Sequence, residues 1–443
     1  MYTSYIGKKF LRIYKEKEKK PENYTAKEFF DEVLFPVFFD DEKHLMHVHG
    51  STFFQSVGKN DLKTGESESY FRLNRLHQDI ANNRISGSTY VGYAAGKIDQ
   101  PTSGQVSSIG HNIESEEVYA SWVGEGLSIG FSGGLILIDN EEIMWNLFKG
   151  WILYRKYINQ TPNIKGRQIE TWNGHWLAHC FSKDFNKEHP LTFFELPIGT
   201  SGEEKGTISI ATLNWAKIIF ALSRKFPNTV ITSHAYFLGK TNTTFGFINL
   251  YLPDVRRMFE LRDKLFLDKE KMVLSDKEIE TLEPFYRFNE ACKMGTIGLK
   301  SIEPRGLREF MSKGTVDYTQ GKDYKFTDER SLINFQLYKL WIIAMLNKTE
   351  LLKLATDVSR ALLAHESHDP KENRGKSEKS NQVKGILDSK NLKNFIDGLT
   401  ELVIKENADI FKEVVEQTLK MPSDNFPLFS TLIRFEYAFL KTK

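Results

Sequence analysis

The sequence predicts an α+β fold in which a mixed α/β N-terminal body with a β-hairpin precedes an all-α C-terminal helical bundle. Three observations predict this class. Strand-forming and helix-forming segments alternate through most of the chain, two β-rich segments flank a short polar tip, and strand signals stop near residue 328. Because 443 residues is about three times a typical domain, we expect two domains, at residues 1–328 and 329–443.

Helices and strands are expected to alternate in the N-terminal body. Thr25 is followed three residues later by Glu28 and then by an apolar run, which is the signature of a capped helix. Ten of the thirty glycines lie between Gly87 and Gly134, among β-forming residues, and indicate strands joined by glycine-dependent loops. Segments 141–157 and 213–225 have the apolar spacing of amphipathic helices.

The clearest hairpin covers residues 229–252, where the β-rich runs TVITSHAYFL and FGFINLYL flank the polar tip from Gly239 to Thr244. From about Asp328 onward, apolar residues recur at helical spacing and predict a bundle of about five helices. The segment from His365 to Gln382 is charged and has no apolar period, so we expect a loop there.

Composition indicates a folded protein without a disulfide framework. Hydrophobic residues make up 40% of the chain and charged residues 27%, which is too apolar for intrinsic disorder. The two cysteines, Cys180 and Cys292, supply neither a set of disulfides nor a four-thiolate zinc site. The first twenty residues lack the apolar stretch of a signal peptide, and no apolar run is long enough to span a bilayer. We therefore expect a cytoplasmic protein with no membrane partner.

The overall charge does not identify a partner. Sixty basic and 58 acidic residues leave a formal charge of +2, which neither requires nor excludes a polyanion. The first twenty residues carry seven basic side chains and two acidic ones. This basic end is suited to phosphate, but it is equally typical of a solvated helix face.

Two histidine groups are candidates for metal binding. His44, His47 and His49 place three imidazoles within six residues, although only two of them share a face on either a strand or a helix. A metal-dependent nuclease or defence-associated hydrolase using this cluster is the alternative function. His175 and His179 have i, i+4 spacing but lack the glutamate of the zincin pattern, so a packed element suits them better.

The motifs of the common hydrolases are missing from the sequence. No acidic residue followed by a Glu-x-Lys pair indicates a restriction-type nuclease, and no Gly-x-x-x-x-Gly-Lys-Ser/Thr loop indicates ATP use. A Gly-x-Ser-x-Gly nucleophile elbow is missing as well. We therefore expect no catalytic residues, no metal and no cofactor, and hence a protein that is not an enzyme.

Two polar loops have the chemistry of nucleic-acid contacts. The glycine-flanked loop 96–105 and the hairpin tip each combine a lysine, suited to phosphate, with short hydroxyl and amide side chains, suited to base edges in a narrow groove. Each loop is also typical of an ordinary solvated turn. Two arginines behind the hairpin add positive charge, although they are equally suited to surface ion pairs. The candidate nucleic-acid-binding residues are Lys97, Gln100, Thr102, Ser103, Gln105, Lys240, Thr241, Asn242, Thr243, Arg256 and Arg257.

This layout of a mixed α/β body with polar loops and a C-terminal helical bundle resembles the large subunit of type I CRISPR Cascade complexes. The resemblance implies that the body grips the crRNA 5′ handle and reads the protospacer-adjacent motif, while the bundle guides displaced DNA. The loop from Lys97 to Gln105 resembles the motif-sensing loops of that family, and the tip from Lys240 to Thr244 resembles its wedge hairpin. The sequence departs from some branches by lacking Cys-x-x-Cys zinc pairs.

The resemblance implies a non-catalytic large subunit of a crRNA-guided DNA surveillance complex, which recognises the protospacer-adjacent motif and helps to open target DNA. Its implied partners are crRNA, target double-stranded DNA, other Cascade subunits and a recruited nuclease-helicase. Besides the metal-dependent hydrolase, a helical-bundle interaction protein that binds no nucleic acid remains a third hypothesis.

Overall fold

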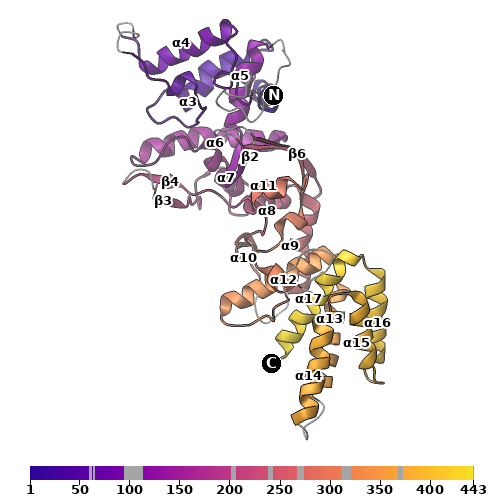
Figure 1. Ribbon diagram of the computed structural model, residues 1–443. Coiled ribbons are helices and arrows are strands. Elements are labelled where there is room, and N and C mark those ends of the chain that lie inside the picture. The colour runs from indigo at the N-terminus through magenta and orange to yellow at the C-terminus, as the bar shows by residue number, and fades with distance from the viewer. Residues whose placement is uncertain are drawn as a thin grey trace. The chain divides into compact units, whose positions relative to one another are not determined.

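The computed structural model describes residues 1–58, 62, 65–93, 113–200, 206–237, 243–266, 274–311, 321–367 and 373–442, with the backbone alone at 373–377. The chain divides into two compact units (Figure 1). Unit 1 contains residues 1–253 and 287–297, and unit 2 contains residues 254–286 and 298–443. The expected α+β class is confirmed, because unit 1 combines a sheet with helices and the C-terminal part of the chain is helical. The boundary expected at residue 328 falls inside unit 2.

Unit 1 is built from a five-stranded sheet, a small two-stranded sheet and the helices around them. Its helical segments are α1 (Tyr2–Lys17), α2 (Ala26–Phe29), the π-helix η1 (Phe30–Leu34), α3 (Phe35–Phe38), η2 (Thr52–Phe54), α4 (Glu68–Ala81), α5 (Ser115–Gly126), α6 (Glu141–Gln160), α7 (Ile169–Cys180), α8 (Trp215–Lys225) and α11 (Phe288–Cys292). Its strands are β1 (Ile129–Phe131), β2 (Gly134–Ile138), β3 (Ile198–Thr200), β4 (Ile208–Ile210), β5 (Val230–Phe237), β6 (Thr243–Tyr251) and β7 (Thr296–Ile297).

Local sequence signals set several of these elements. The Thr25 hydroxyl accepts the Glu28 backbone N–H while the Glu28 carboxylate accepts the Thr25 N–H, so the predicted capping box opens α2. The side chains of Asn140 and Asn214 cap α6 and α8, and both helices match the predicted amphipathic segments. The larger sheet has the order β1-β2-β5-β6-β7, with antiparallel pairs except for the parallel pair β6–β7.

Helices α1 and α5 are in backbone contact, which two glycines allow. A Cβ on Gly7 would lie 1.8 Å from the carbonyl oxygen of Ala120, and a Cβ on Gly124 would lie 1.9 Å from that of Thr3. No side chain fits at such distances, so only glycine lets the two helices approach so closely. Thr3 also donates its hydroxyl hydrogen bond to the carbonyl of Val91 at 2.6 Å. The N-terminal helix is therefore held against the core of unit 1.

The inward face of the hairpin is tied to α5 by a buried polar contact. The Tyr236 hydroxyl donates a 2.7 Å hydrogen bond to the carboxylate of Glu125, whose side chain is 1% exposed. Burial raises the pKa of Glu125 to about 7. Burial, with the nearby charge of Glu125, raises the pKa of Glu170 at the start of α7 to about 8. Glu170 keeps part of its surface accessible, so Glu125 is the more strongly desolvated of the pair.

Unit 2 is helical throughout its described residues except for an isolated bridge between Pro284 and Pro304. Helix α9 (Leu252–Phe266) begins in unit 1 and continues into unit 2. The remaining segments are α10 (Asp276–Glu280), η3 (Leu299–Ile302), η4 (Leu307–Glu309), α12 (Glu329–Leu346), α13 (Glu350–Ser367), α14 (Asn373–Leu387), α15 (Leu392–Glu401), α16 (Ala408–Lys420), η5 (Ser423–Asn425) and α17 (Phe426–Leu440). Helices α13 to α17 pack as one bundle (Figure 1).

The expected loop from His365 to Gln382 is helical in its described residues. Helix α13 continues to Ser367, and α14 begins at Asn373. The charged stretch carries no apolar period because α14 buries apolar side chains only near its C-terminal end, at Val383, Ile386 and Leu387. Within the described part of the chain, no helix has the length and apolar character needed to cross a bilayer.

The segment before α12 belongs structurally with the bundle. Trp341 of α12 donates its indole hydrogen bond to the carbonyl of Leu299 at 3.0 Å, and the Tyr338 hydroxyl donates to that of Arg305 at 2.9 Å. Arg434 of α17, whose side chain is 6% exposed, donates to the carbonyls of Phe310 and Gly321. A bundle cut at residue 329 would leave these buried donors without partners, which destabilises a fold.

We predict that a chain of residues 254–443 unfolds at a clearly higher temperature than one of residues 329–443. The longer chain keeps the carbonyl acceptors of Trp341, Tyr338 and Arg434, whose loss costs roughly 1–3 kcal/mol each. Thermal melts followed by circular dichroism at 222 nm test this. Equal melting temperatures would show that residue 329 is a true domain boundary.

We also predict that Glu125→Gln stabilises unit 1 at alkaline pH. An unfolded glutamate ionises near pH 4.5, whereas the folded one stays protonated up to about pH 7, so the free energy of unfolding falls as pH rises between these values. Over that range the wild-type protein loses on the order of 3 kcal/mol through Glu125. Glutamine stays neutral and still accepts the Tyr236 hydrogen bond.

Urea denaturation at pH 5, 6.5 and 8 measures this effect, with the exposed Glu141→Gln as control. The stability of Glu125→Gln relative to wild type should rise with pH, and that of Glu141→Gln should not change. A difference from wild type that is the same at all three pH values would contradict the raised pKa.

Candidate nucleic-acid interface

The predicted hairpin is present and presents one face outward. Strands β5 and β6 pair antiparallel, and the directly opposed pairs Val230–Tyr251, Thr232–Asn249 and His234–Phe247 alternate with buried pairs. The side chains of Ile231, Ser233, Ala235, Ile248 and Leu250 point into the core. Since side chains alternate along a strand, the polar and aromatic pairs share the opposite face.

A bulge changes the twist of the hairpin near its tip. The register shifts between Ala235 and Tyr236, opposite Gly246. Gly246 has a φ of +90° in otherwise open space, a conformation that favours glycine. The bulge lets Tyr236 point inward to Glu125 while His234, two residues earlier, lies on the outward face.

Aromatic rings dominate the outward face next to α1. We call Tyr2, Tyr5, His234 and Phe247 the aromatic platform. The rings of Tyr2 and Tyr5 stack at 5.5 Å, and Tyr2 lies 4.6 Å from His234 and 5.3 Å from Phe247. Phe247 is 67% exposed and Tyr5 is 47% exposed. Exposed rings on a sheet face are suited to stacking with unpaired bases.

Hydrogen-bonding groups lie on the same face. Asn249 accepts a long hydrogen bond of 3.4 Å from the Thr232 hydroxyl, and among the described residues its amide donor has no partner. The Thr244 hydroxyl lies 3.2 Å from Nε2 of His234. Burial lowers the pKa of His234 to about 4, so this ring is neutral at physiological pH. The platform therefore offers neutral stacking and hydrogen bonding rather than charge.

Most cations of the basic N-terminal end are already paired. Lys8 lies 2.8 Å from Glu117, Lys9 lies 2.6 Å from Asp139, and Lys20 lies 2.8 Å from Glu32. Arg12 differs, because it is exposed and no described residue contacts its guanidinium. Arg12 follows Tyr5 by seven residues on α1, so it lies on the same helix face as this member of the platform.

The structure bears on only three of the candidate residues predicted from the two loops and the arginines behind the hairpin. Thr243 begins β6 and pairs with Phe237, whereas Arg256 and Arg257 lie on α9 within unit 2. Arg256 is 3.3 Å from Glu260, and Arg257 is paired with Asp254. These arginines form the surface ion pairs considered as their alternative. The candidates outside the described residues are Lys97, Gln100, Thr102, Ser103, Gln105, Lys240, Thr241 and Asn242.

His44, His47 and His49 do not converge on a metal site. His44 is buried against Phe39 and Phe54, with ring centroids 5.5 and 5.3 Å away. Burial and the nearby charges of Arg167, Arg72 and Arg155 lower its pKa to about 4. A set of arginines that disfavours an imidazolium also disfavours a divalent cation at the same place. Across the described residues, no three His, Cys, Asp or Glu side chains are placed to hold a metal ion.

The second histidine pair serves packing. His175 Nε2 lies 2.8 Å from the carbonyl oxygen of Ala211, and His179 Nε2 lies 3.0 Å from that of Pro190. Both rings therefore satisfy backbone carbonyls between elements of unit 1. The expectation that this pair suits a packed element is confirmed.

Sequence reasoning missed the aromatic platform, although a signal for it was present. In the run FGFINLYL, Phe245, Phe247, Asn249 and Tyr251 alternate with small or aliphatic residues. Period-two alternation marks one face of a strand, so this pattern predicts a polar and aromatic outward face. The contribution of Tyr2 and Tyr5 required knowing that α1 packs beside the hairpin.

Comparisons of the chain with protein-family models, with curated proteins and with solved structures gave no match. The candidate interface is therefore defined by its own geometry, which is a hairpin face with exposed rings, a free amide donor and a cation on the adjoining helix.

Proposed function

We propose that this chain is a non-catalytic nucleic-acid-recognition protein that contacts its ligand through the outward face of the β5–β6 hairpin. The observation that carries the proposal is the aromatic platform, whose most exposed ring, Phe247, is opposed to His234 and lies beside a free amide donor at Asn249. Stacking surfaces bordered by hydrogen-bonding groups are how sheets bind unpaired bases.

The resemblance to Cascade large subunits supports a narrower form of this proposal. In that form the chain is a cytoplasmic subunit of a crRNA-guided surveillance complex. It reads a protospacer-adjacent motif and helps to open target DNA, together with crRNA, other subunits and a recruited nuclease-helicase. The hairpin tip from Lys240 to Thr243 would then enter a groove while the platform receives a base released from its pair.

We predict that Phe247→Ala weakens binding of labelled single-stranded DNA or RNA by the full chain. Loss of one stacking ring costs roughly 1–3 kcal/mol of binding free energy. Fluorescence anisotropy measures the affinity. Phe193→Ala is the matched control, because Phe193 is also in unit 1, is 78% exposed and has no described ring contact with the platform.

Arg12→Gln should act differently from Phe247→Ala in the same assay. A cation that meets phosphate lowers the salt dependence of binding by about one charge when it is removed, whereas loss of a neutral ring leaves the salt slope unchanged. Equal affinities of wild type, Phe247→Ala and Arg12→Gln at two salt concentrations would contradict the hairpin face as the interface.

We further predict that the isolated protein does not cut single- or double-stranded DNA in the presence of Mg²⁺ or Mn²⁺. The separate packing of His44, His47 and His49 supports this expectation. Gel analysis of labelled DNA tests it. Cleavage that His47→Ala abolishes would favour the metal-dependent hydrolase instead.

A further inference from the structure

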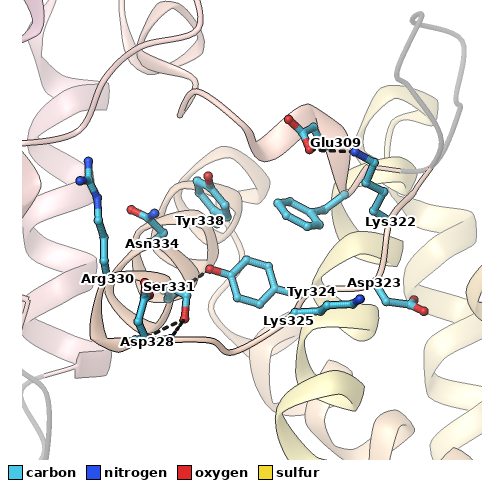
Figure 2. A pocket seen from close by; sticks show the side chains of 11 residues that line it. Glu309, Lys322, Asp323, Tyr324, Lys325, Asp328, Arg330, Ser331, Asn334 and Tyr338 are labelled. Carbon is cyan, nitrogen blue, oxygen red and sulfur yellow. Dashed lines mark hydrogen bonds and ion pairs between the residues drawn. The ribbon is translucent and has the colours of Figure 1, made fainter.

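A cavity in unit 2 has the size and lining of a ligand site. It has a volume of about 660 Å³ and lies among η4, the segment 322–325 and the first turns of α12 (Figure 2). Sites for small molecules and cofactors usually measure roughly 300–1,000 Å³ and combine apolar walls with a few polar groups. All of its lining residues belong to unit 2, so it is separate from the hairpin face of unit 1.

Aromatic rings form the wall of the cavity. The ring centroid of Tyr324 lies 4.9 Å from that of Phe310 and 6.3 Å from that of Tyr338. The Tyr338 hydroxyl donates to the carbonyl of Arg305 at 2.9 Å, and the Tyr324 hydroxyl donates to that of Ser331. Because both hydroxyls are occupied by the protein, the two rings are fixed in orientation and offer planar surface to a ligand.

The position of this wall is set by a buried arginine. Arg434 donates to the carbonyls of Phe310 and Gly321, and so joins the two chain segments on either side of the cavity entrance. A Cβ on Gly321 would lie 2.0 Å from Nη1 of Arg434, so glycine is needed for this contact. Backbone hydrogen bonds from Gly321 to Met311 and from Lys322 to Glu309 complete the connection. The site is therefore organised before any ligand binds, which lowers the entropic cost of binding.

The acidic side chains of the lining are already engaged with the protein. Glu309 lies 3.2 Å from the ammonium of Lys322, and Asp323 lies 3.5 Å from Arg434. Asp328 is the N-cap of α12 and accepts a backbone N–H there. Its carboxylate therefore occupies the helix N-terminus.

Two cations and one amide in the lining remain available. Lys325 and Arg330 are exposed, and among the described residues neither has an ion-pair or hydrogen-bond partner. The same holds for the side-chain amide of Asn334. Figure 2 shows Arg330 and Asn334 on the α12 side of Tyr324 and Lys325 in front of its ring. The uncommitted groups are thus two positive charges and one amide around an aromatic wall.

We propose that this cavity binds a mononucleotide, that is, a planar heteroaromatic base that carries a phosphate group. The base packs against Tyr324 and Tyr338, the phosphate pairs with Lys325 and Arg330, and the Asn334 amide donates to or accepts from the base edge. A guanidinium and an ammonium are the side chains that most often bind phosphate, and neutral rings bind any base without requiring a sequence.

Isothermal titration calorimetry with the full chain tests the proposal. The probes are the four ribonucleoside 5′-monophosphates, the corresponding nucleosides and inorganic phosphate. We expect at least one monophosphate to bind saturably, at least about tenfold more tightly than its nucleoside or phosphate alone, because only the whole molecule reaches both the rings and the cations. Absence of saturable binding by all four monophosphates would overturn the proposal.

Single substitutions assign the binding to this cavity. Lys325→Gln and Arg330→Gln should each weaken the monophosphate by roughly tenfold or more and leave the nucleoside unaffected, since each removes one charge-assisted contact to phosphate. Lys353→Gln is the matched control, an exposed lysine of α13 outside the cavity lining. Wild-type affinity in both cavity variants would overturn the assignment.

Two further measurements separate this proposal from its alternatives. Circular dichroism melts of the variants establish that they are folded, and exposed side chains such as Lys325 and Arg330 are expected to be replaceable without loss of stability. Phe247→Ala in unit 1 should leave mononucleotide binding unchanged. Failure of the hairpin interface and failure of this cavity site are therefore distinguishable.

Discussion

The backbone contact between α1 and α5 is the constraint on which the candidate interface depends. Gly7 faces the carbonyl of Ala120 and Gly124 faces that of Thr3, at distances that no other residue type permits. This contact fixes where α1 lies, and α1 carries Tyr2 and Tyr5 to the outward face of the hairpin. From the other side, the hydrogen bond between Tyr236 and Glu125 ties the hairpin to the same α5 helix. Helix α5 therefore sets the relative placement of both parts of the aromatic platform.

The regular parts of the fold were predictable because their signals are local. The capping box at Thr25 and the alternation within residues 229–252 depend on neighbours in sequence, and both were correctly predicted. The helical spacing after residue 328 also gave the bundle. The segment from His365 to Gln382 was wrongly predicted as a loop, because solvated helices need no apolar period when their neighbours supply the contacts.

The candidate site was predictable only in part. The sequence indicated the hairpin, but the platform joins residue 2 to residue 247, and a contact of that separation has no local signal. The histidines illustrate the opposite error, in which clustering along the sequence suggested a shared ligand. In the structure His44 packs among phenylalanines near three arginines, and its spacing from His47 has no bearing on metal binding. The same limit applies to the cavity of unit 2, whose lining combines η4 with α12.

The parallel pairing of β6 with β7 has a consequence for how the protein is made. Residues 287–297, which include β7, belong to unit 1, yet they follow residues 254–286 of unit 2 in the chain. Domains that emerge first from the ribosome usually fold first. Here unit 1 cannot complete its sheet until residue 297 has been synthesised, by which time the first segment of unit 2 is already outside. Synthesis therefore leaves the last strand of one unit and the first helices of the other to fold in the same interval.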